Sequence, residues 1–558
     1  MACLLGTCCF VVYLTNLRQM GASDTIPARL LPFSIVREGN LDLDEFQWLR
    51  PHNTQPYFLR RGVGGHEFSL YPVATPIVLS PLYLPVVAWL TVRQIPDDDV
   101  RFRLISVVME RIGAALLTAL SVAVLYLALC TLASSATALA IAMVYAFGTS
   151  AWSISSQSLW QHAATQLALA GLSLCLLRPP SLRNTAAAGG WAAFAVLARP
   201  TMVIFVLLAL VYVWRQRRSH LLAFLAAPTA GVAWLLWYNL GSFGLIKGGY
   251  ADAPLAAPSL ERLAGLLVSP NRGLLVFTPA AVLALPAMIL RRYRQPAWLA
   301  YLAIGVVCGL FLYACFDIWY AGACYGPRYL SDALPAIALL TVPVVQRVRG
   351  FRLGRAGLLV LAGWGVCVQV IGVYFDDGSW NNWPAQITPE RPWDWHDTHI
   401  GRALRAGWHG GDLGPLLWQT LVDAHPVRLR PLAAGDLAGH ISIRSAQPLR
   451  YAAGGSGFID LTVTNRGTAT WPAFSDFGFM NCEVLQRWWA HGAMVQGVGG
   501  GLPLPRNLGT GESASMRARI ELPPRPGAYE LELVLVQHLT VNEAASGGAG
   551  VRVPVQIE

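Results

Sequence analysis

The carboxylate with the greatest chemical potential in this sequence is Asp24, in the segment GASDTIPARLLP directly after the apolar stretch of residues 1–15. A carboxylate at a membrane surface is costly to desolvate, which makes it a functional candidate, and it can act as a general base toward a hydroxyl group. The alternative is structural, because Asp often caps a helix that has proline in its first turn, as Thr25-Ile26-Pro27 would provide. The sequence leaves both roles open.

Three arginines could bind a phosphate group. Arg199 (in LARPT), Arg272 (in SPNRGLL) and Arg328 (in CYGPRYL) each lie beside the end of an apolar segment, among glycine or proline residues. A guanidinium group matches a phosphate with two parallel hydrogen bonds. Arginines at helix ends also extend their charge toward the membrane surface without any further role. The predicted topology places all three on one face, and this favours phosphate binding.

His162, Trp319 and Tyr325 are further candidates for contact with a substrate. His162, in SSQSLWQHA, could bind a sugar, a phosphate or a metal, although a lone histidine of this kind is more often a packing residue. Trp319 and Tyr325 belong to the loop FDIWYAGACYGPRYLSD, which suits stacking on sugar rings, but aromatic belts at membrane interfaces have the same composition. Asp42 and Asp44, in GNLDLDEF, are interpreted as a solvated face or a second helix cap rather than as catalytic groups.

The elements that must position these side chains are predicted to be membrane helices. Hydrophobic residues make up 54% of the 558 positions and charged residues 13%, whereas soluble domains are about one quarter charged. The formal net charge of +10 comes mostly from arginines in short clusters between apolar segments. That is a topology signal, so no nucleic-acid partner is expected. The sequence contains no P-loop, dinucleotide fingerprint, nucleophile elbow or zincin helix, so an energy source must enter with the substrate.

About eleven membrane spans are predicted. One is a retained anchor at residues 1–15, and the long stretch 184–214 is expected to cross twice, with a break at Arg199-Pro200. The apolar segment 71–92 contains four prolines, so it is interpreted as a juxtamembrane or re-entrant segment rather than as a regular spanning helix. The other spans are predicted near residues 111–132, 137–153, 159–177, 219–240, 274–290, 297–315, 332–346 and 356–374.

Arginine placement predicts how these spans are oriented. Four connections between spans carry arginine clusters, and positively charged loops favour the cytoplasmic side. With those connections inside, the N-terminus is also inside, whereas the first loop (residues 17–110) with Asp24 and everything after about Tyr374 are outside. The clusters are Arg178 and Arg183; Arg215, Arg217 and Arg218; Arg291, Arg292 and Arg294; and Arg347, Arg349, Arg352 and Arg355.

The C-terminal part of the chain has a different character from the membrane region of residues 1–374. Residues 375–436 are rich in Trp, Pro, Asp and His and are interpreted as a linker outside the membrane. From residue 437 to 558, apolar and polar residues alternate in short runs that predict a small antiparallel β-sandwich. Docking or glycan contact is the expected role of this domain. The runs are HISIRSA, GFIDLTVTN, ASMRARIELP, GAYELELVLVQ and VRVPVQIE.

The sequence resembles the GT-C superfamily of glycosyltransferases, which are polytopic membrane enzymes. Five segments in the same order carry the resemblance, which covers most of residues 17–340: SDTIPARLLPFSIVREGNLDLDEF, SLYPVATPIVLSPLYLP, AFGTSAWSISSQSLWQH, YNLGSFG with GLLVSPNRGLLVF, and WYAGACYGPRYLSDALP. The resemblance implies a bacterial inner-membrane enzyme with Asp24 as the catalytic residue of its first periplasmic loop. It also implies a polyprenyl-phosphate-linked sugar donor and a glycan, lipid or protein acceptor, with inversion at the sugar.

Two departures limit what the resemblance implies. Aminoarabinose and mannosyl transferases of this superfamily have an Asp-Glu pair in the first loop, whereas Ser23 precedes and Thr25 follows Asp24 here. A requirement for a divalent cation, Mg²⁺ or Mn²⁺, therefore stays open. SLYPVATP stands where those enzymes have Lys-Pro-Pro, so no lysine contact to the carrier phosphate is implied. A transporter or flippase of lipid-linked glycans is the alternative function.

Overall fold

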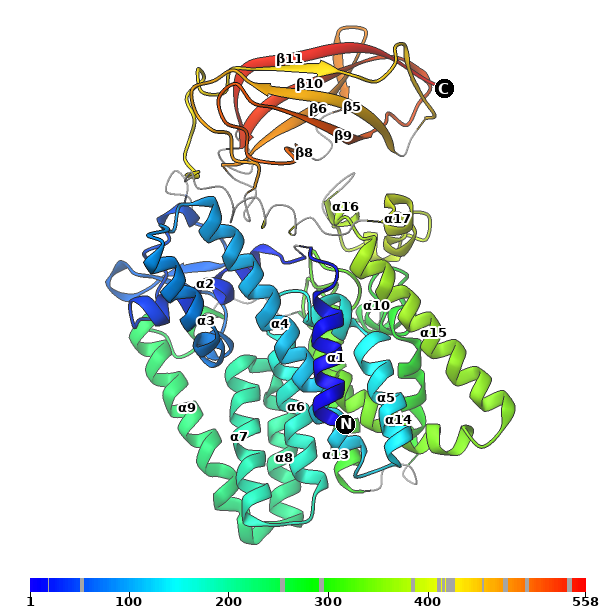
Figure 1. Ribbon diagram of the computed structural model, residues 1–558. Coiled ribbons are helices and arrows are strands. Elements are labelled where there is room, and N and C mark those ends of the chain that lie inside the picture. Colours follow the sequence, from blue (N-terminus) through cyan, green and yellow to red (C-terminus); the bar gives the residue numbers. More distant parts are fainter. Residues whose placement is uncertain are drawn as a thin grey trace. The chain divides into compact units, whose positions relative to one another are not determined.

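The chain forms two compact units (Figure 1). This computed structural model describes residues 1–558 except 19, 51–54, 251–255, 291–295, 383–386, 409–412, 414–416, 418–426, 454–455, 475–479, 497–500 and 539–543. The arginine cluster predicted at 291–294 therefore lies outside the described residues. The first unit comprises residues 1–44, 55–87 and 109–411, and the second comprises residues 45–54, 88–108 and 412–558.

The first unit is built mainly of helices. Glycine and proline set several of their ends. Helix α9, for example, ends at Gly244, whose φ of 66° is a left-handed conformation that glycine adopts without strain. The helices are α1 (Ala2–Leu14), α2 (Ile26–Arg37), α5 (Ser135–Phe147), α6 (His162–Leu177), α7 (Leu182–Ala198), α8 (Val203–Gln216), α9 (Leu221–Phe243), α10 (Leu260–Val268), α11 (Leu274–Phe277), α12 (Leu285–Ile289), α13 (Trp298–Ala314), α14 (Leu334–Val348), α15 (Arg352–Tyr374), α16 (Ser379–Asn382) and α17 (His399–Ala406). Helices α3 (Ala74–Val92) and α4 (Val100–Leu129) have residues in both units.

Five helical segments within the described residues are long and apolar enough to cross a membrane, judged by length and composition alone. Six further apolar segments are shorter, with 10–17 residues each. Every predicted span coincides with at least one helix, but the number of membrane crossings stays a prediction. The five long segments are Ala74–Val92, Val100–Leu129, Arg218–Phe243, Arg328–Val348 and Arg352–Tyr374.

Helix α3 differs from the interpretation of its sequence. It is a continuous helix of 19 residues, so the prediction that its prolines prevent a regular helix is wrong. Pro76 lies in the first turn, where the missing N–H has no helical partner. Pro81 and Pro85 are four residues apart and both exposed, so they share one outer face and the helix can bend away from them. The position of this segment at the membrane surface stays a prediction.

The predicted break at Arg199-Pro200 is confirmed. Helix α7 ends at Ala198, and Arg199 has extended backbone angles (φ −156°, ψ 118°), which a residue before proline favours over the helical region. A 3₁₀ turn, η6 (Pro200–Met202), then leads directly into α8. The break turns the Arg199 side chain out of the helical register of both α7 and α8.

The second unit contains two β-sheets that share one hydrophobic core, which is the arrangement of a β-sandwich. One sheet has the order β4-β11-β10-β6-β7 with β8 beside β6, and the other has the order β3-β5-β9. All pairs are antiparallel except β4 with β11. In β5 the fully buried Ile459, Leu461 and Val463 alternate with less buried residues, which explains the period of two in the sequence. The strands are β3 (Gly439–Ile443), β4 (Leu449–Tyr451), β5 (Ser456–Asn465), β6 (Cys482–Ala490), β7 (Ala493–Gln496), β8 (Leu502–Pro503), β9 (Ser513–Glu521), β10 (Gly527–His538) and β11 (Ala544–Ile557).

The segment interpreted as a linker is partly folded. Helices α16 and α17 and the 3₁₀ turn Arg391–Trp393 lie within it, and the first unit extends to residue 411. Each of the five predicted β-runs contains a strand of the sandwich. The alternating pattern therefore located β3, β5, β9, β10 and β11 but missed β4, β6, β7 and β8, and a composition rich in Trp, Pro and Asp concealed two short helices.

Candidate functional site

Asp24 lies in a 3₁₀ turn, η1 (Ser23–Thr25), between α1 and α2. Pro27 in the first turn of α2 suits a helix start, because its missing N–H would have no partner there. The N-cap residue of α2 is Thr25, and it makes no side-chain capping hydrogen bond. The Asp24 carboxylate accepts a hydrogen bond from Arg328 Nη1 at 2.7 Å. This geometry assigns Asp24 to an ion pair rather than to a helix cap.

One cavity brings four of the seven predicted site residues together. Asp24, His162, Arg199 and Arg328 line this cavity, which has a volume of about 460 Å³. They come from the turn before α2, the first residue of α6, the break between α7 and α8, and the first residue of the 3₁₀ turn η11 (Arg328–Ala333). A concave site of several hundred Å³ can hold a sugar-sized ligand. Aromatic residues complete the wall: Tyr71, Trp160, Phe316 and Tyr329.

Asp332 lies behind the cavity lining and contacts two residues of that lining, His162 and Arg199. Its Oδ1 atom lies 2.8 Å from His162 Nδ1 and accepts a hydrogen bond from Thr165 Oγ1 at 2.6 Å. Its Oδ2 atom accepts hydrogen bonds from Tyr313 OH at 2.7 Å and forms an ion pair with Arg199 Nε at 3.1 Å. With four partners and a side chain only 3% exposed, Asp332 fixes both His162 and Arg199.

His162 is held in one orientation by this arrangement. A carboxylate beside Nδ1 favours the tautomer in which Nδ1–H donates to Asp332, which leaves Nε2 as an acceptor. Nη1 of Arg199 lies 3.3 Å from both ring nitrogens, so the guanidinium group covers the imidazole. His162 is therefore packed and hydrogen-bonded while it also lines the cavity.

Aromatic rings support the two arginines of the cavity. The guanidinium carbon of Arg328 lies 5.5 Å from the ring centre of Trp160. That of Arg199 lies 5.8 Å from the ring centres of both Tyr313 and Tyr329. Aromatic faces attract cations, so these contacts favour guanidinium groups at the cavity wall. Each arginine also has a carboxylate partner, Asp24 or Asp332, so the two pairs are neutral overall.

Arg272 lies outside the cavity and is only 1% exposed. Each of its five N–H groups has an internal partner, so none is directed toward a ligand. The acceptors are Tyr320 O (3.0 Å), Asn271 O (2.9 Å), His399 Nδ1 (3.0 Å), Gly322 O (3.1 Å) and Asn381 Oδ1 (2.9 Å). Arg272 therefore does not share the cavity with Arg199 and Arg328. Its hydrogen bonds instead link its own segment to residues 320–322, 381 and 399, which is a structural role.

Trp319 and Tyr325 are also absent from the cavity lining. Trp319 is 2% exposed and packs against Trp393, with ring centres 6.4 Å apart. Tyr325 is 3% exposed, and its hydroxyl donates to Val368 O at 3.0 Å. Because both rings are covered by protein, neither presents a face for stacking on a sugar. The aromatic residues that line the cavity are instead Tyr71, Trp160, Phe316 and Tyr329.

A second buried group surrounds Arg272. Nε2 of His399 lies 3.1 Å from Asp376 Oδ1, while its Nδ1 accepts from Arg272. Burial lowers the pKa of His399 more than Asp376 raises it. Burial alone would raise the pKa of Asp376, but the charge and hydrogen bond of His399 and other donors bring the net shift downward. A neutral His399 that bridges Arg272 and Asp376 suits this arrangement.

Sequence reasoning missed Asp332, although a signal was available. A carboxylate at the start of an apolar segment, in GPRYLSDALP, is rare and costly unless it has a partner. A separate group, Asp42, Asp44 and His66, could hold a metal ion. It is the one such group of three or more His, Cys, Asp or Glu side chains in the described part of the chain, and it does not line the cavity.

No protein-family model matches the chain, and no curated protein matches it significantly. Among solved structures, one similar chain is the Pseudomonas fluorescens alkylpurine DNA glycosylase AlkC bound to DNA containing an abasic site analog. It is 11% identical, and the match covers 79% of this chain and 99% of that chain with a TM-score of 0.16. A TM-score this low does not indicate a shared fold, so function has to be inferred from the site.

Proposed function

We propose that this protein is an integral membrane glycosyltransferase of the GT-C type. It transfers a sugar from a polyprenyl-phosphate donor to a glycan, lipid or protein acceptor on the periplasmic side of a bacterial inner membrane. One observation carries the proposal most directly, namely that Asp24, Arg199 and Arg328 line the same cavity although they are far apart in the sequence. A carboxylate beside two guanidinium groups provides both a base and an anion-binding group, which are the two functions that this reaction requires.

In the proposed reaction Asp24 accepts the proton of the acceptor hydroxyl. The hydroxyl oxygen attacks the anomeric carbon from the side opposite the phosphate, and the bond between that carbon and the phosphate oxygen breaks. The electron pair of this bond leaves with the polyprenyl phosphate, and the configuration at the anomeric carbon is inverted. Arg199 and Arg328 stabilise the departing phosphate, because guanidinium groups bind its oxygens with charge-assisted hydrogen bonds.

The ion pair between Arg328 and Asp24 has a part in this proposal. Their side chains are 12% and 16% exposed, so a ligand in the cavity can reach both. A donor phosphate would compete with Asp24 for the Arg328 guanidinium group. Donor binding would then release the carboxylate for proton transfer, so Asp24 becomes available as a base only when the sugar is in place.

The test compares two matched pairs of variants in detergent, with carrier release from candidate polyprenyl-phosphate sugars and an acceptor extract followed by thin-layer chromatography. Asp24→Asn should lower transfer by roughly 10²–10⁴-fold, and Arg328→Lys should weaken donor binding. Arg262 and Asp317 form an ion pair with a separation of 3.0 Å, and neither residue lines the cavity. Asp317→Asn and Arg262→Lys therefore serve as controls that should retain activity.

Two results would reject the proposal. Near-normal transfer by well-folded Asp24→Asn protein would exclude the carboxylate as the base. Movement of lipid-linked glycan across proteoliposomes, without carrier release or a new glycosidic product, would favour the transporter or flippase instead. Such a protein has no reaction to show in detergent, because it needs two compartments.

A further inference from the structure

The loop after α2 is fixed against a small hairpin in the first unit. The hairpin pairs β1 (Leu59–Arg61) with β2 (Glu67–Ser69) in antiparallel register. Asp42 forms an antiparallel bridge with Phe68, and Leu43 N donates to Glu67 O at 2.8 Å. Glu67 N in turn donates to Asp44 Oδ1 at 2.8 Å. These contacts hold residues 42–44 alongside β2 and therefore beside His66.

The turn of the hairpin places His66 at this position. Gly64 and Gly65 have φ angles of 74° and 85°, a left-handed conformation that glycine adopts without strain. The turn closes with a hydrogen bond from Gly62 N to His66 O at 2.8 Å. His66 then follows directly, one residue before β2, with its ring toward the Asp42–Asp44 segment.

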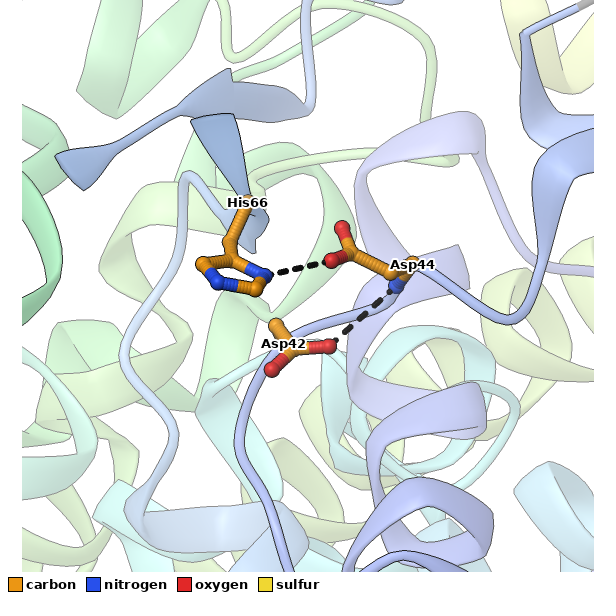
Figure 2. A group of neighbouring side chains, drawn as sticks. All are labelled: Asp42, Asp44 and His66. Carbon is orange, nitrogen blue, oxygen red and sulfur yellow. Dashed lines mark hydrogen bonds and ion pairs between the residues drawn. The ribbon is translucent and has the colours of Figure 1, made fainter. Parts of the chain in front are cut away.

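The side chains of Asp42, Asp44 and His66 point toward one another, as Figure 2 shows. Each offers one ligand atom, and these atoms all lie within 4.8 Å of one another. His66 Nδ1 and Asp44 Oδ2 are 2.6 Å apart. In a tetrahedral zinc site, ligand atoms that lie about 2.1 Å from the metal are about 3.4 Å from one another. His66 Nδ1 and Asp44 Oδ2 must therefore separate by about 0.8 Å to admit an ion. Exposed side chains can make this adjustment, since His66 and Asp44 are 54% and 40% exposed.

The side-chain amide of Asn40 contacts this group of residues. Asn40 Nδ2 contacts Asp42 Oδ1 at 3.3 Å, which places the amide directly beside the cluster. The Oδ1 atom of the same amide is buried and has no hydrogen-bond partner among the described residues. The amide nitrogen of Asn40, rather than its oxygen, therefore faces the cluster, and it helps to hold the Asp42 carboxylate beside Asp44 and His66.

The geometry points to a divalent-cation site formed by Asp42, Asp44 and His66. An imidazole ligand together with carboxylates favours a zinc-type cation over Mg²⁺ or Ca²⁺, which prefer oxygen ligands alone. The cation takes the place of the hydrogen-bonding proton between His66 Nδ1 and Asp44 Oδ2. Its positive charge offsets the repulsion between the carboxylates of Asp42 and Asp44. It therefore links the loop after α2 to the hairpin. This site is independent of the proposed glycosyl transfer, because none of its residues lines the cavity.

The test measures zinc binding by the full-length protein, purified in detergent and stripped with EDTA. Calorimetric titration with zinc chloride should give one saturable site per chain, with weaker binding of magnesium chloride. His66→Ala and Asp44→Asn should each weaken zinc binding by roughly tenfold or more. His66 tolerates truncation because its side chain is 54% exposed. His440→Ala, at an exposed histidine of β3, is the matched control and should bind zinc normally.

A second readout does not depend on the titration itself. Zinc should raise the unfolding temperature of the unaltered protein and of His440→Ala, but not that of His66→Ala, because a ligand stabilises only the state that binds it. Equal zinc affinity in His66→Ala, Asp44→Asn and the control would overturn the site. The absence of saturable binding would overturn it as well, and magnesium binding as tight as zinc would refute the role of the imidazole.

Discussion

Asp332→Asn is the substitution that tests the organisation of the cavity most severely. The carboxylate accepts from His162, Thr165 and Tyr313 and pairs with Arg199. An asparagine has the same shape but replaces one acceptor oxygen with an NH₂ donor. In either orientation of the amide, this NH₂ group faces the donors that contacted the Oδ1 or the Oδ2 atom of Asp332. The Arg199 side chain is 11% exposed and loses its counter-charge. Removing one member of a buried ion pair costs about 3–5 kcal/mol, so a destabilisation of this size is expected.

The assay is equilibrium unfolding in detergent, with Arg199→Gln and the double variant measured beside Asp332→Asn. The double variant should be destabilised by less than the two single changes added together, because it leaves no charge without a partner. The same variants should also weaken donor binding, since Arg199 loses the contact that holds its guanidinium group at the cavity wall. A change below about 0.5 kcal/mol for Asp332→Asn, or strict additivity in the cycle, would refute the reasoning.

Three further predictions concern other parts of the first unit. Arg272→Lys should destabilise the fold by about 3–6 kcal/mol, because lysine has three donors for five acceptors and each of the two lost hydrogen bonds contributes about 1.5–3 kcal/mol. Unfolding measurements check this value, and a normally stable variant would contradict it. The pKa of His399 is lowered in the folded state, so the unfolded state binds more protons below about pH 6.5. The free energy of unfolding should therefore decrease as the pH falls below that value, by up to about 1.4 kcal/mol per pH unit. Unfolding temperatures between pH 7.5 and 5.5 should show a smaller dependence in His399→Gln, and an identical dependence would argue against this origin. Gly189→Ala should separate α7 from α9, because its Cβ would lie 2.2 Å from Phe224 O, and the free energy of unfolding should decrease by about 1–3 kcal/mol. Gly190→Ala has open space around its Cβ and should be tolerated in the same unfolding assay.

Residue type and local pattern predicted individual features well. The proline after Arg199 indicated the helix break, and the period of two located five strands of the sandwich, although it missed β4, β6, β7 and β8. Pairing across the chain was beyond local pattern. Asp24 and Arg328 were each selected as polar residues at the ends of apolar segments, but nothing local indicated that they meet across more than 300 positions.

The errors have physical causes as well. An arginine that faces a cavity and one whose donors are all satisfied internally have similar local sequences, so Arg272 was grouped with Arg199 and Arg328 although its contacts are internal. For α3, proline was counted as a helix breaker without regard to the face it occupies. Pro81 and Pro85 share an exposed face, where neither disrupts packing.

The pairing of Arg199 with Asp332 has a consequence for biogenesis. In the proposed membrane protein, Arg199 emerges from the ribosome about 130 residues before Asp332. Until then Asp332 is not available to hold the Arg199 side chain, which lies at the break between α7 and α8 and can extend its charge toward the membrane surface. The wall of the cavity that contains Arg199 therefore reaches its final arrangement only after most of the first unit has been synthesised. Assembly of the cavity would then be a late step in the biogenesis of the protein.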